Sequence, residues 1–175
     1  MLDHIAEHQD EILKLWIDHT IEDYPEETVK FMRSKTDPFA NPVGASLREG
    51  LSELLDGIFR GVEPEELEPA LDRVIRVRAV QEFAPSAALG FVFDLKDLVR
   101  EAVGATNAEG EESIVTINNR IERLGLIAFD VYMGCREQMW AIRAREIRHQ
   151  SVGIMERVAE WRERREENSE THHRS

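Results

Sequence analysis

The sequence predicts an all-α domain whose last helix is much longer than the others. Apolar residues recur at intervals of three and four along the 175 residues, and no convincing strand pattern of alternating apolar and polar residues stands out. The six prolines all lie at or before Pro85. From Glu111 onward the chain can therefore form one helix of about 55 residues, or two nearly collinear ones, because no proline interrupts it.

The first helix is expected to run from about Leu2 to Asp23, and Pro25 ends it. Five residues are expected to share one face of this helix: Ile5, Ile12, Leu15, Trp16 and His19. A short helix is predicted near Glu26–Ser34. Residues 37–44 contain two prolines and a glycine, so a structured loop is expected there.

The third helix is predicted at about Ala45–Gly61, and Gly61 is a suitable C-terminal stop. Its buried residues are expected to be Leu47, Leu51, Leu54, Leu55 and Ile58. A fourth helix should begin at Pro64, because proline is favoured in a first turn and the neighbouring acids interact with the positive end of the helix dipole. We expect it to continue to about Phe83.

The fifth helix is expected after the joint Ala84-Pro85-Ser86, and it should end near Gly104. Its apolar stripe contains Ala88, Phe91, Val92, Leu95, Leu98, Val99 and Ala102.

The long last helix contains two apolar seams that differ in phase. The first faces the core and contains Ile114, Ile117, Ile121, Leu124, Ala128, Val131 and Cys135. The second follows after a five-residue step and has the spacing of a heptad repeat: Trp140, Ala144, Ile147, Ser151, Ile154, Val158 and Trp161. A partner helix is the natural cover for the second seam, and the alternative is that residues 137–165 fold back onto the first helix.

Three segments are therefore expected. Residues 1–135 form the helical body, and residues 136–167 continue the long helix as a seam for dimerisation or for a partner. Residues 168–175 are polar and are expected to be a disordered tail.

Composition excludes several classes of function. The net charge of −13 argues against a nucleic-acid surface, since phosphate binding needs concentrated basic residues. The charge is uneven, because residues 136–175 hold 9 Lys/Arg and 8 Asp/Glu whereas residues 1–135 hold 13 and 27. No apolar run approaches the roughly 18 residues of a membrane span, and the acidic N-terminus is unlike a signal peptide. With a single cysteine, Cys135, a cytoplasmic location is expected.

No assembled catalytic or metal-binding group is recognisable, so we expect a non-enzymatic protein without a cofactor. His4 and His8 have the spacing of a metal pair but lack a third ligand. His19 is expected to be a hydrogen-bonded core residue on the apolar face. Cys135 lies within a helix on a buried stripe, where a neutral thiol is inert.

Arg78 is the residue that departs from its local pattern, because it projects onto the apolar stripe of the fourth helix, one to two turns after Leu71, Val74 and Ile75. One interpretation is a snorkelling arginine whose head reaches water or a helix C-terminus. The other is that Arg78 and Gln81 line a small polar cavity that receives an anionic ligand or a neighbouring carboxylate. His19 is the third candidate ligand-binding residue.

Several motifs carry a resemblance to a known family. These are Asn41-Pro42-Val43-Gly44, the run Arg76-x-Arg78-Ala79-x-Gln81, and Pro85-Ser86 followed by an aromatic-rich helix. Over about Ile12 to Val103 the chain resembles the N-terminal domain of RsbR and RsbRD-type co-antagonists of the bacterial stressosome. The resemblance implies a globin-like fold without haem, a dimer, and a long last helix that transmits a signal. Residues 64–104 contain no histidine that could serve as a proximal haem ligand.

In that family the long helix leads into a phosphorylatable STAS domain, and this chain stops at Ser175. Kinase binding and phosphorylation are therefore not expected here, and the output should lie in another protein. We expect a cytoplasmic, homodimeric sensor or regulatory domain of the stress response, with an unknown protein partner, a possible small anionic ligand, and no nucleic acid or membrane. The alternatives are a constitutive dimeric adaptor without a ligand and a haem or metal protein.

Overall fold

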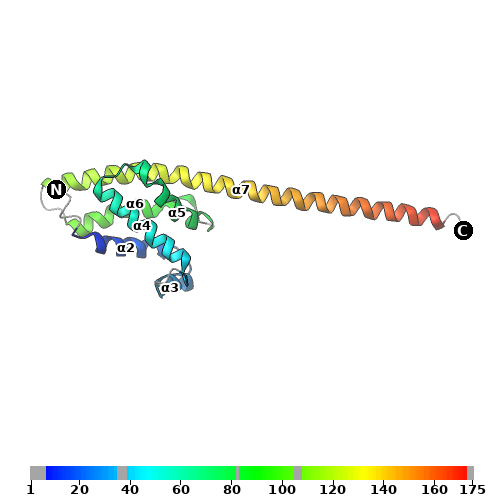
Figure 1. Ribbon diagram of the computed structural model, residues 1–175, viewed down its shortest axis with the longest axis horizontal. Helices are drawn as coiled ribbons and strands as arrows, with labels where there is room; N and C mark the ends of the chain where they lie inside the picture. The colour runs from blue at the N-terminus through cyan, green and yellow to red at the C-terminus, as the bar shows by residue number, and fades with distance from the viewer. Residues whose placement is uncertain (1–6, 35–38, 82, 105–107, 173–175) are drawn as a thin grey trace. The chain divides into compact units, whose positions relative to one another are not determined.

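The computed structural model describes residues 7–34, 39–81, 83–104 and 108–172. Every regular element in these ranges is a helix, so the predicted all-α class is confirmed (Figure 1). The chain divides into two compact units, Met1–Cys135 and Arg136–Ser175. Among the described residues, no helix is both long enough and apolar enough to cross a lipid bilayer.

Helix α2 (Gln9–Glu22) ends three residues before Pro25, as expected, while residues 2–6 of the predicted first helix lie outside the described residues. Its buried side chains are those of Ile12, Trp16, Thr20 and Ile21. The prediction for Leu15 and His19 was wrong, since both are exposed. The buried face is centred toward Leu13 and Ile17, which pack partly against the core, so positions 15 and 19 lie beyond its edge.

Helix α3 (Glu26–Ser34) has the predicted bounds. Helix α4 (Pro42–Arg60) begins three residues earlier than predicted, so residues 42–44 are helical instead of forming a loop, and residues 35–38 lie outside the described residues. The earlier start has a local cause. The Asn41 side chain caps the helix by accepting a hydrogen bond from the Gly44 backbone N–H at 2.9 Å, and Pro42 occupies the first turn, where proline is favoured.

Asn41 is fully buried, and its Nδ2 also donates to the Met32 carbonyl of α3 at 3.2 Å. Asn41→Ala is therefore expected to lower the free energy of unfolding by about 1–2 kcal/mol, because it removes both the cap and this link. Urea denaturation of the full chain measures the change. The exposed Asn119→Ala is the matched control and should stay within about 0.5 kcal/mol; equal effects of the two variants would contradict the capping role.

The predicted glycine stops are confirmed, since Gly61 and Gly104 adopt left-handed conformations with φ of 78° and 51° after α4 and α6 (Pro85–Val103). The predicted fourth helix was too long. It is a 3-10 turn, η1 (Pro64–Leu67), followed by α5 (Glu68–Ala79). A second proline, Pro69, lies in the first turn of α5 and lacks the N–H that would continue an α-helix from Pro64.

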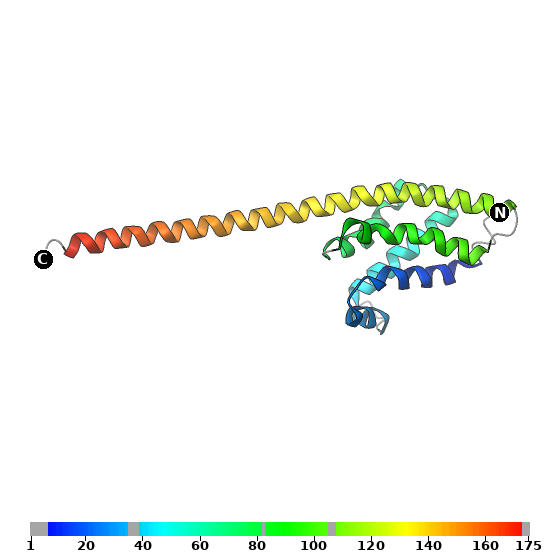
Figure 2. The ribbon, with the colours of Figure 1, turned by 180° about the vertical axis from the view of Figure 1, so that it is seen from behind.

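Helix α7 (Ala108–His172) passes Gly134 without a break in its helical assignment and extends to His172, so only residues 173–175 of the expected tail lie outside the described part. Within the first unit, α6 lies between α2 and the early part of α7 (Figures 1 and 2). Gly125 permits this approach, because a Cβ there would lie 2.5 Å from the Phe93 ring of α6. Lys96 Nζ and Glu122 Oε1 form an ion pair at 2.7 Å beside it.

The first seam of α7 is buried as predicted at Ile114, Ile117, Ile121, Leu124, Ala128 and Cys135. At the remaining position Val131 is only partly buried, and Tyr132 is 2% exposed. Tyr132 was not predicted to be in the core, because its side chain carries a polar hydroxyl group. The step from Ala128 to Tyr132 to Cys135 nevertheless keeps the spacing of four and three.

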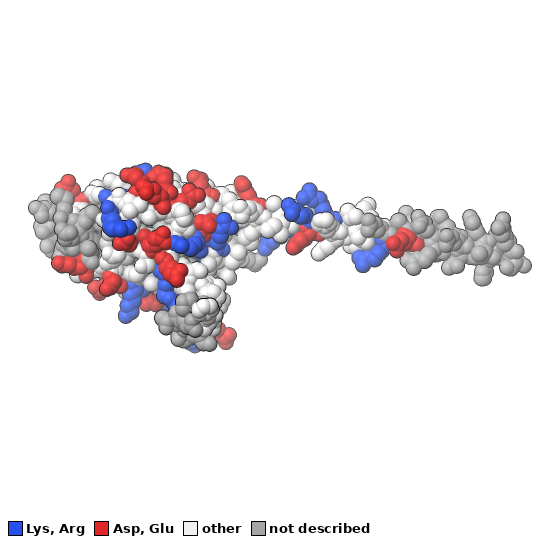
Figure 3. Space-filling view, in the orientation of Figure 1, with Lys and Arg blue, Asp and Glu red and all other residues white. Residues whose placement is uncertain are grey.

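Two arginines of α7 also contact the last turn of α4 and the connection that follows it. Arg120 Nη1 donates to the Ile58 carbonyl at 2.7 Å, close to the Gly61 turn. Arg123 donates to Glu63 at 3.0 Å and to Glu65 at 2.9 Å. On the face of the first unit seen in Figure 3, acidic and basic side chains are interspersed in this way instead of gathering in one basic patch.

Candidate functional site

Arg78 lies in the last turn of α5, on the face that packs into the core, and its side chain is only 1% exposed. Moving an unpaired charge from water into a protein interior is strongly unfavourable. A guanidinium this deeply buried therefore requires acceptors on all sides.

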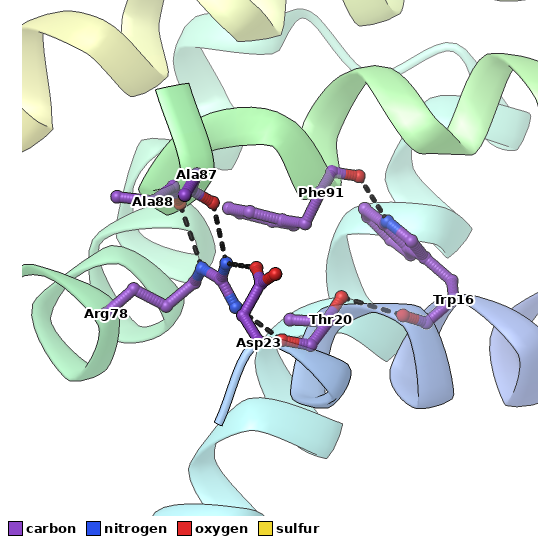
Figure 4. A network of polar contacts seen from close by, with 7 residues as sticks. All are labelled: Trp16, Thr20, Asp23, Arg78, Ala87, Ala88 and Phe91. Carbon is purple, nitrogen blue, oxygen red and sulfur yellow. Dashed lines mark hydrogen bonds and ion pairs between the residues drawn. The ribbon is translucent and has the colours of Figure 1, made fainter. Parts of the chain in front are cut away.

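Four oxygen acceptors from two other helices surround the guanidinium (Figure 4). From α6, the carbonyl of Ala88 accepts from Nε at 2.9 Å, and that of Ala87 accepts from Nη2 at 2.7 Å. From the C-terminal end of α2, Asp23 Oδ2 accepts from Nη2 at 2.6 Å, and the carbonyl of Thr20 accepts from Nη1. The contacts use four of the five guanidinium N–H groups, so Arg78 connects α5, α2 and α6 at one point.

The position also suits a cation because two helices end there. The last turns of α2 and α5 present the negative ends of their helix dipoles, which interact favourably with a positive charge. Asp23, which is 46% exposed, supplies the only full negative charge among the four acceptors.

Aromatic rings cover the rest of the guanidinium. Its Cζ lies 5.8 Å from the ring centroid of Tyr24, 5.3 Å from that of Phe83 and 5.5 Å from that of Phe91. The rings of Tyr24 and Phe83 meet edge to face, with centroids 5.3 Å apart. Ring faces attract a cation electrostatically, so the enclosure stabilises the charge while excluding water from it.

A second polar link joins the same helices. Trp16 Nε1 of α2 donates to the Phe91 carbonyl of α6 at 2.6 Å, and the two rings stack with centroids 6.1 Å apart (Figure 4). One turn later in α2, the Thr20 hydroxyl donates to the Trp16 carbonyl at 2.7 Å. The buried polar groups of α2 are thus bonded either within that helix or to α5 and α6.

Tyr24 has a buried hydroxyl that has no partner with hydrogen-bond geometry within the described part of the chain, although the Arg78 guanidinium lies close enough to act on its pKa. Burial raises the pKa of Tyr24, against the opposing effect of the Arg78 charge, because the phenolate is poorly solvated there. The neutral phenol is therefore the form that the folded protein favours.

Tyr24→Phe is expected to leave the protein equally stable or to stabilise it by up to about 1 kcal/mol, because it removes an unsatisfied buried hydroxyl. Above about pH 10 the unfolded wild type loses the Tyr24 proton before the folded state does, so Tyr24 makes stability fall with rising pH in that range. The variant should lack this contribution. Chemical denaturation at neutral and alkaline pH measures both effects; a large loss of stability at neutral pH would show that the hydroxyl is bonded.

The structure places the three candidate ligand-binding residues differently. Arg78 is fully buried, so its head does not reach water, but it does reach the C-terminal end of α2, which is the other destination in the snorkelling interpretation. It pairs with a neighbouring carboxylate, that of Asp23, which was one of the two partners considered. Gln81 is half-buried, and its backbone N–H donates to the Arg78 carbonyl at 3.2 Å. His19 is exposed and near enough to Asp94 for its charge to oppose the increase in the Asp94 pKa that burial causes.

Ligand binding at Arg78, Gln81 and His19 remains a prediction, and a carboxylate that binds Arg78 through two hydrogen bonds would have to displace an existing acceptor. The sequence identified Arg78 but not its partners. Thr20 and Asp23 lie 58 and 55 residues before it, and the acceptors on α6 are backbone carbonyls, which no residue type signals.

The second unit has a different surface, since none of its described side chains is buried. The apolar residues of the second seam are about half exposed or more: Trp140 60%, Ile147 63%, Ile154 53%, Val158 45% and Trp161 54%. Ala144 and Ser151 between them are also exposed. The first unit adds exposed apolar side chains on α7 itself, Leu126 at 71%, Phe129 at 50% and Met133 at 40%.

The remaining candidates for chemistry are isolated. Among the described residues, no three His, Cys, Asp or Glu side chains are grouped so that they could hold a metal ion. His4 lies outside those residues, and His8 Nδ1 is 3.7 Å from Glu11 Oε2. Cys135 is a free thiol that is 8% exposed, and burial raises its pKa, which keeps it in the unreactive protonated form.

Comparison with known proteins agrees with the motifs. Residues 10–147 match the model of the RsbT co-antagonist protein rsbRD N-terminal domain, and this range covers all the contacts around Arg78. A protein of Archaeoglobus fulgidus described as uncharacterized is 23% identical over 158 residues, which cover 87% of this chain and 93% of that protein. No solved structure matches the chain.

Proposed function

We propose, on the premise that this chain belongs to the RsbT co-antagonist protein rsbRD N-terminal domain family, that it is a non-enzymatic sensor domain signalling to a separate protein through α7. The family is one of regulatory domains associated with the stressosome. Our proposal adds a globin-like fold without haem, a cytoplasmic location, a homodimer, and a protein partner that receives the signal.

The exposed second seam is the observation that carries this proposal. Its large residues recur every seven positions, at Trp140, Ile147, Ile154 and Trp161, with smaller residues between them. A heptad seam of this length needs a second helix, since one helix cannot bury its own apolar side. Exposed apolar surface of this extent on a chain with 33% charged residues indicates an interaction site.

A second copy of the chain is the partner that we propose for the seam. In a symmetric dimer the same face serves both chains, so no further sequence is required. Leu126 and Met133 precede Trp140 at the same seven-residue interval, which extends the repeat toward the first unit in sequence.

The contacts of Arg78 support a role for the first unit in transmitting a signal. One side chain connects three helices, so a change in the position of α2 or α6 must either move Arg78 or break its hydrogen bonds. Arg78 is therefore proposed as a positioning residue. Its engaged donors also favour the second candidate function, a constitutive dimeric adaptor that needs no ligand.

Light scattering of the full chain tests the proposal. We expect the mass of a dimer at micromolar concentration, and a monomer over the whole accessible range would overturn the homodimer. The sensor and the adaptor differ in a second measurement, the binding of a partner protein with and without a ligand of the first unit. Equal binding in both states would support the adaptor.

A further inference from the structure

The first unit carries an open groove of about 700 Å³ between α2 and the helices α3 and α4. Leu13 and Ile17 of α2 are its apolar residues, and both are half-buried. An adjoining hollow of about 560 Å³ contains the same two residues and extends along α4. The volume lies within the roughly 300–1,000 Å³ that is typical of sites for small molecules.

Helix α2 presents two different faces to its surroundings. Ile12, Trp16 and Thr20 point into the core and toward Arg78, whereas Leu13 and Ile17, each one residue later than a core position, line the groove. The groove is therefore separate from the enclosure of Arg78, but it shares a helix with it.

Two cationic side chains of the groove have N–H groups that can still donate hydrogen bonds to a ligand. Within the described part of the chain, Lys14 Nζ makes no hydrogen bond or ion pair. Arg33 of α3 uses only Nε, which donates to Asp18 Oδ1 at 2.9 Å. Its two terminal nitrogens are thus available. Arg48 also lines the groove, and its Nη1 donates to the Met32 carbonyl at 3.0 Å.

The combination of apolar residues with Lys14 and Arg33, whose remaining N–H donors are available, determines the class of ligand. The groove is lined by three basic and two acidic groups, so on a protein with a net charge of −13 it is a locally positive site that attracts an anion. A guanidinium and an ammonium bind a carboxylate with charge-assisted hydrogen bonds, and Leu13 and Ile17 can bury a hydrocarbon chain. Asp10 and Asp18, also in the groove, disfavour ligands of higher negative charge.

We propose that this groove binds an amphipathic monocarboxylate, with its head between Lys14 and Arg33 and its aliphatic chain on Leu13 and Ile17. The ligand would connect α3 to α2 and so restrain the helix that supplies Thr20 and Asp23 to Arg78. The binding itself does not depend on the proposed sensor function; only its consequence for α7 does.

Octanoate, titrated into the full chain by calorimetry, is the probe that tests the site. We expect saturable binding of one octanoate per chain, with much weaker binding of acetate, which lacks the chain, and of 1-octanol, which lacks the charge. Lys14→Glu should weaken octanoate binding by about tenfold or more, because it replaces an attractive contact by a repulsive one. Lys14 is exposed, so the variant should fold normally.

Lys30→Glu is the matched control, since Lys30 lies on α3 outside the groove and pairs with Glu26 at 2.6 Å. It should leave octanoate affinity unchanged. Three results would overturn the proposal: no saturation at low millimolar octanoate, equal affinity for octanol, or equal effects of the two variants. Binding of an acidic amphipathic peptide in place of octanoate would also overturn it and would indicate a protein partner. A monomeric chain that still binds octanoate would contradict the proposed dimer and leave the site intact.

Discussion

Replacing Ile147 and Ile154 together by glutamate is expected to convert the proposed dimer into folded monomers. Fully burying an isoleucine side chain contributes roughly 1.5–3 kcal/mol, and each of the two positions occurs twice in a symmetric pair. The expected loss is therefore at least about 6 kcal/mol, which corresponds to a Kd increased by about 10⁴-fold. Light scattering and sedimentation of the variant over a concentration series measure this change.

A matched control is available on the opposite side of the same helix. Ile142 and Val152 are also apolar and are 56% and 53% exposed, but they lie outside the seven-residue repeat. Ile142→Glu with Val152→Glu should leave the mass of the dimer unchanged. If both pairs of substitutions dissociate the protein, the seam is not the interface; if neither does, the dimer forms elsewhere.

A measurement of folding in the first unit distinguishes dissociation of the dimer from unfolding of the variant chain. The seam residues are exposed within a single chain, so their replacement should leave the near-UV signal of the core residue Trp16 intact. A wild type that is already monomeric would instead favour a different protein as the partner of the seam, since the single helix α7 with its exposed second seam excludes the alternative in which residues 137–165 fold back onto the first helix.

A helix terminus could be predicted from the sequence where a single proline or glycine marks it. It could not be predicted where two neighbouring residues or two prolines each suit a helix start. Pro85 and Gly104 delimit α6 because one favours a helix start and the other adopts the left-handed stop. The start of α4 was placed too late because Asn41 and Pro42 were interpreted as loop residues, although together they form an N-cap and a first turn. The start of α5 could not be placed from the sequence because Pro64 and Pro69 both suit a first turn, and only Pro69 lies in the first turn of the α-helix.

Helical periodicity predicts that a helix has a buried face more reliably than it predicts where that face is centred. On α7 a long stripe of branched residues left little ambiguity, and six of its seven predicted positions are buried. On α2 several apolar residues compete for the face. A face that includes Leu15 would bury His19, whereas the observed face includes Leu13 and leaves His19 exposed. The groove on Leu13 and Ile17 could not be predicted for the same reason.

Arg78 shows how far a single sequence can define a polar site. Its position on an apolar stripe indicated that the charge needs partners. The identity of those partners depends on how α2 and α6 pack against α5, and tertiary packing of this kind is not encoded in local spacing. The carboxylate of Asp23 lies just after the last turn of α2, where the sequence suggested only a helix end before Pro25.

Arg78→Leu is expected to lower the free energy of unfolding by about 3 kcal/mol or more, since it removes four hydrogen bonds from a charged donor and leaves the acceptors without it. The leucine is shorter than arginine and apolar, so it cannot satisfy the Thr20 carbonyl. Arg78→Lys should recover only part of the loss, because an ammonium cannot reproduce the planar fork of the guanidinium. Urea denaturation of the full chain measures the free energy of each variant.

Arg76 provides the matched control for this experiment, because it lies on the same helix, is exposed, and pairs only within it, with Asp72 at 2.5 Å. Arg76→Leu should change the free energy of unfolding by less than about 0.5 kcal/mol. Asp23→Asn, combined with Arg78→Leu in a double-mutant cycle, isolates the contribution of the ion pair from that of the carbonyl contacts. If Arg78→Leu proves no more destabilising than Arg76→Leu, the three helices are held together by their apolar contacts alone. A role for Arg78 in relaying movement from α2 to α6 would then have no energetic basis.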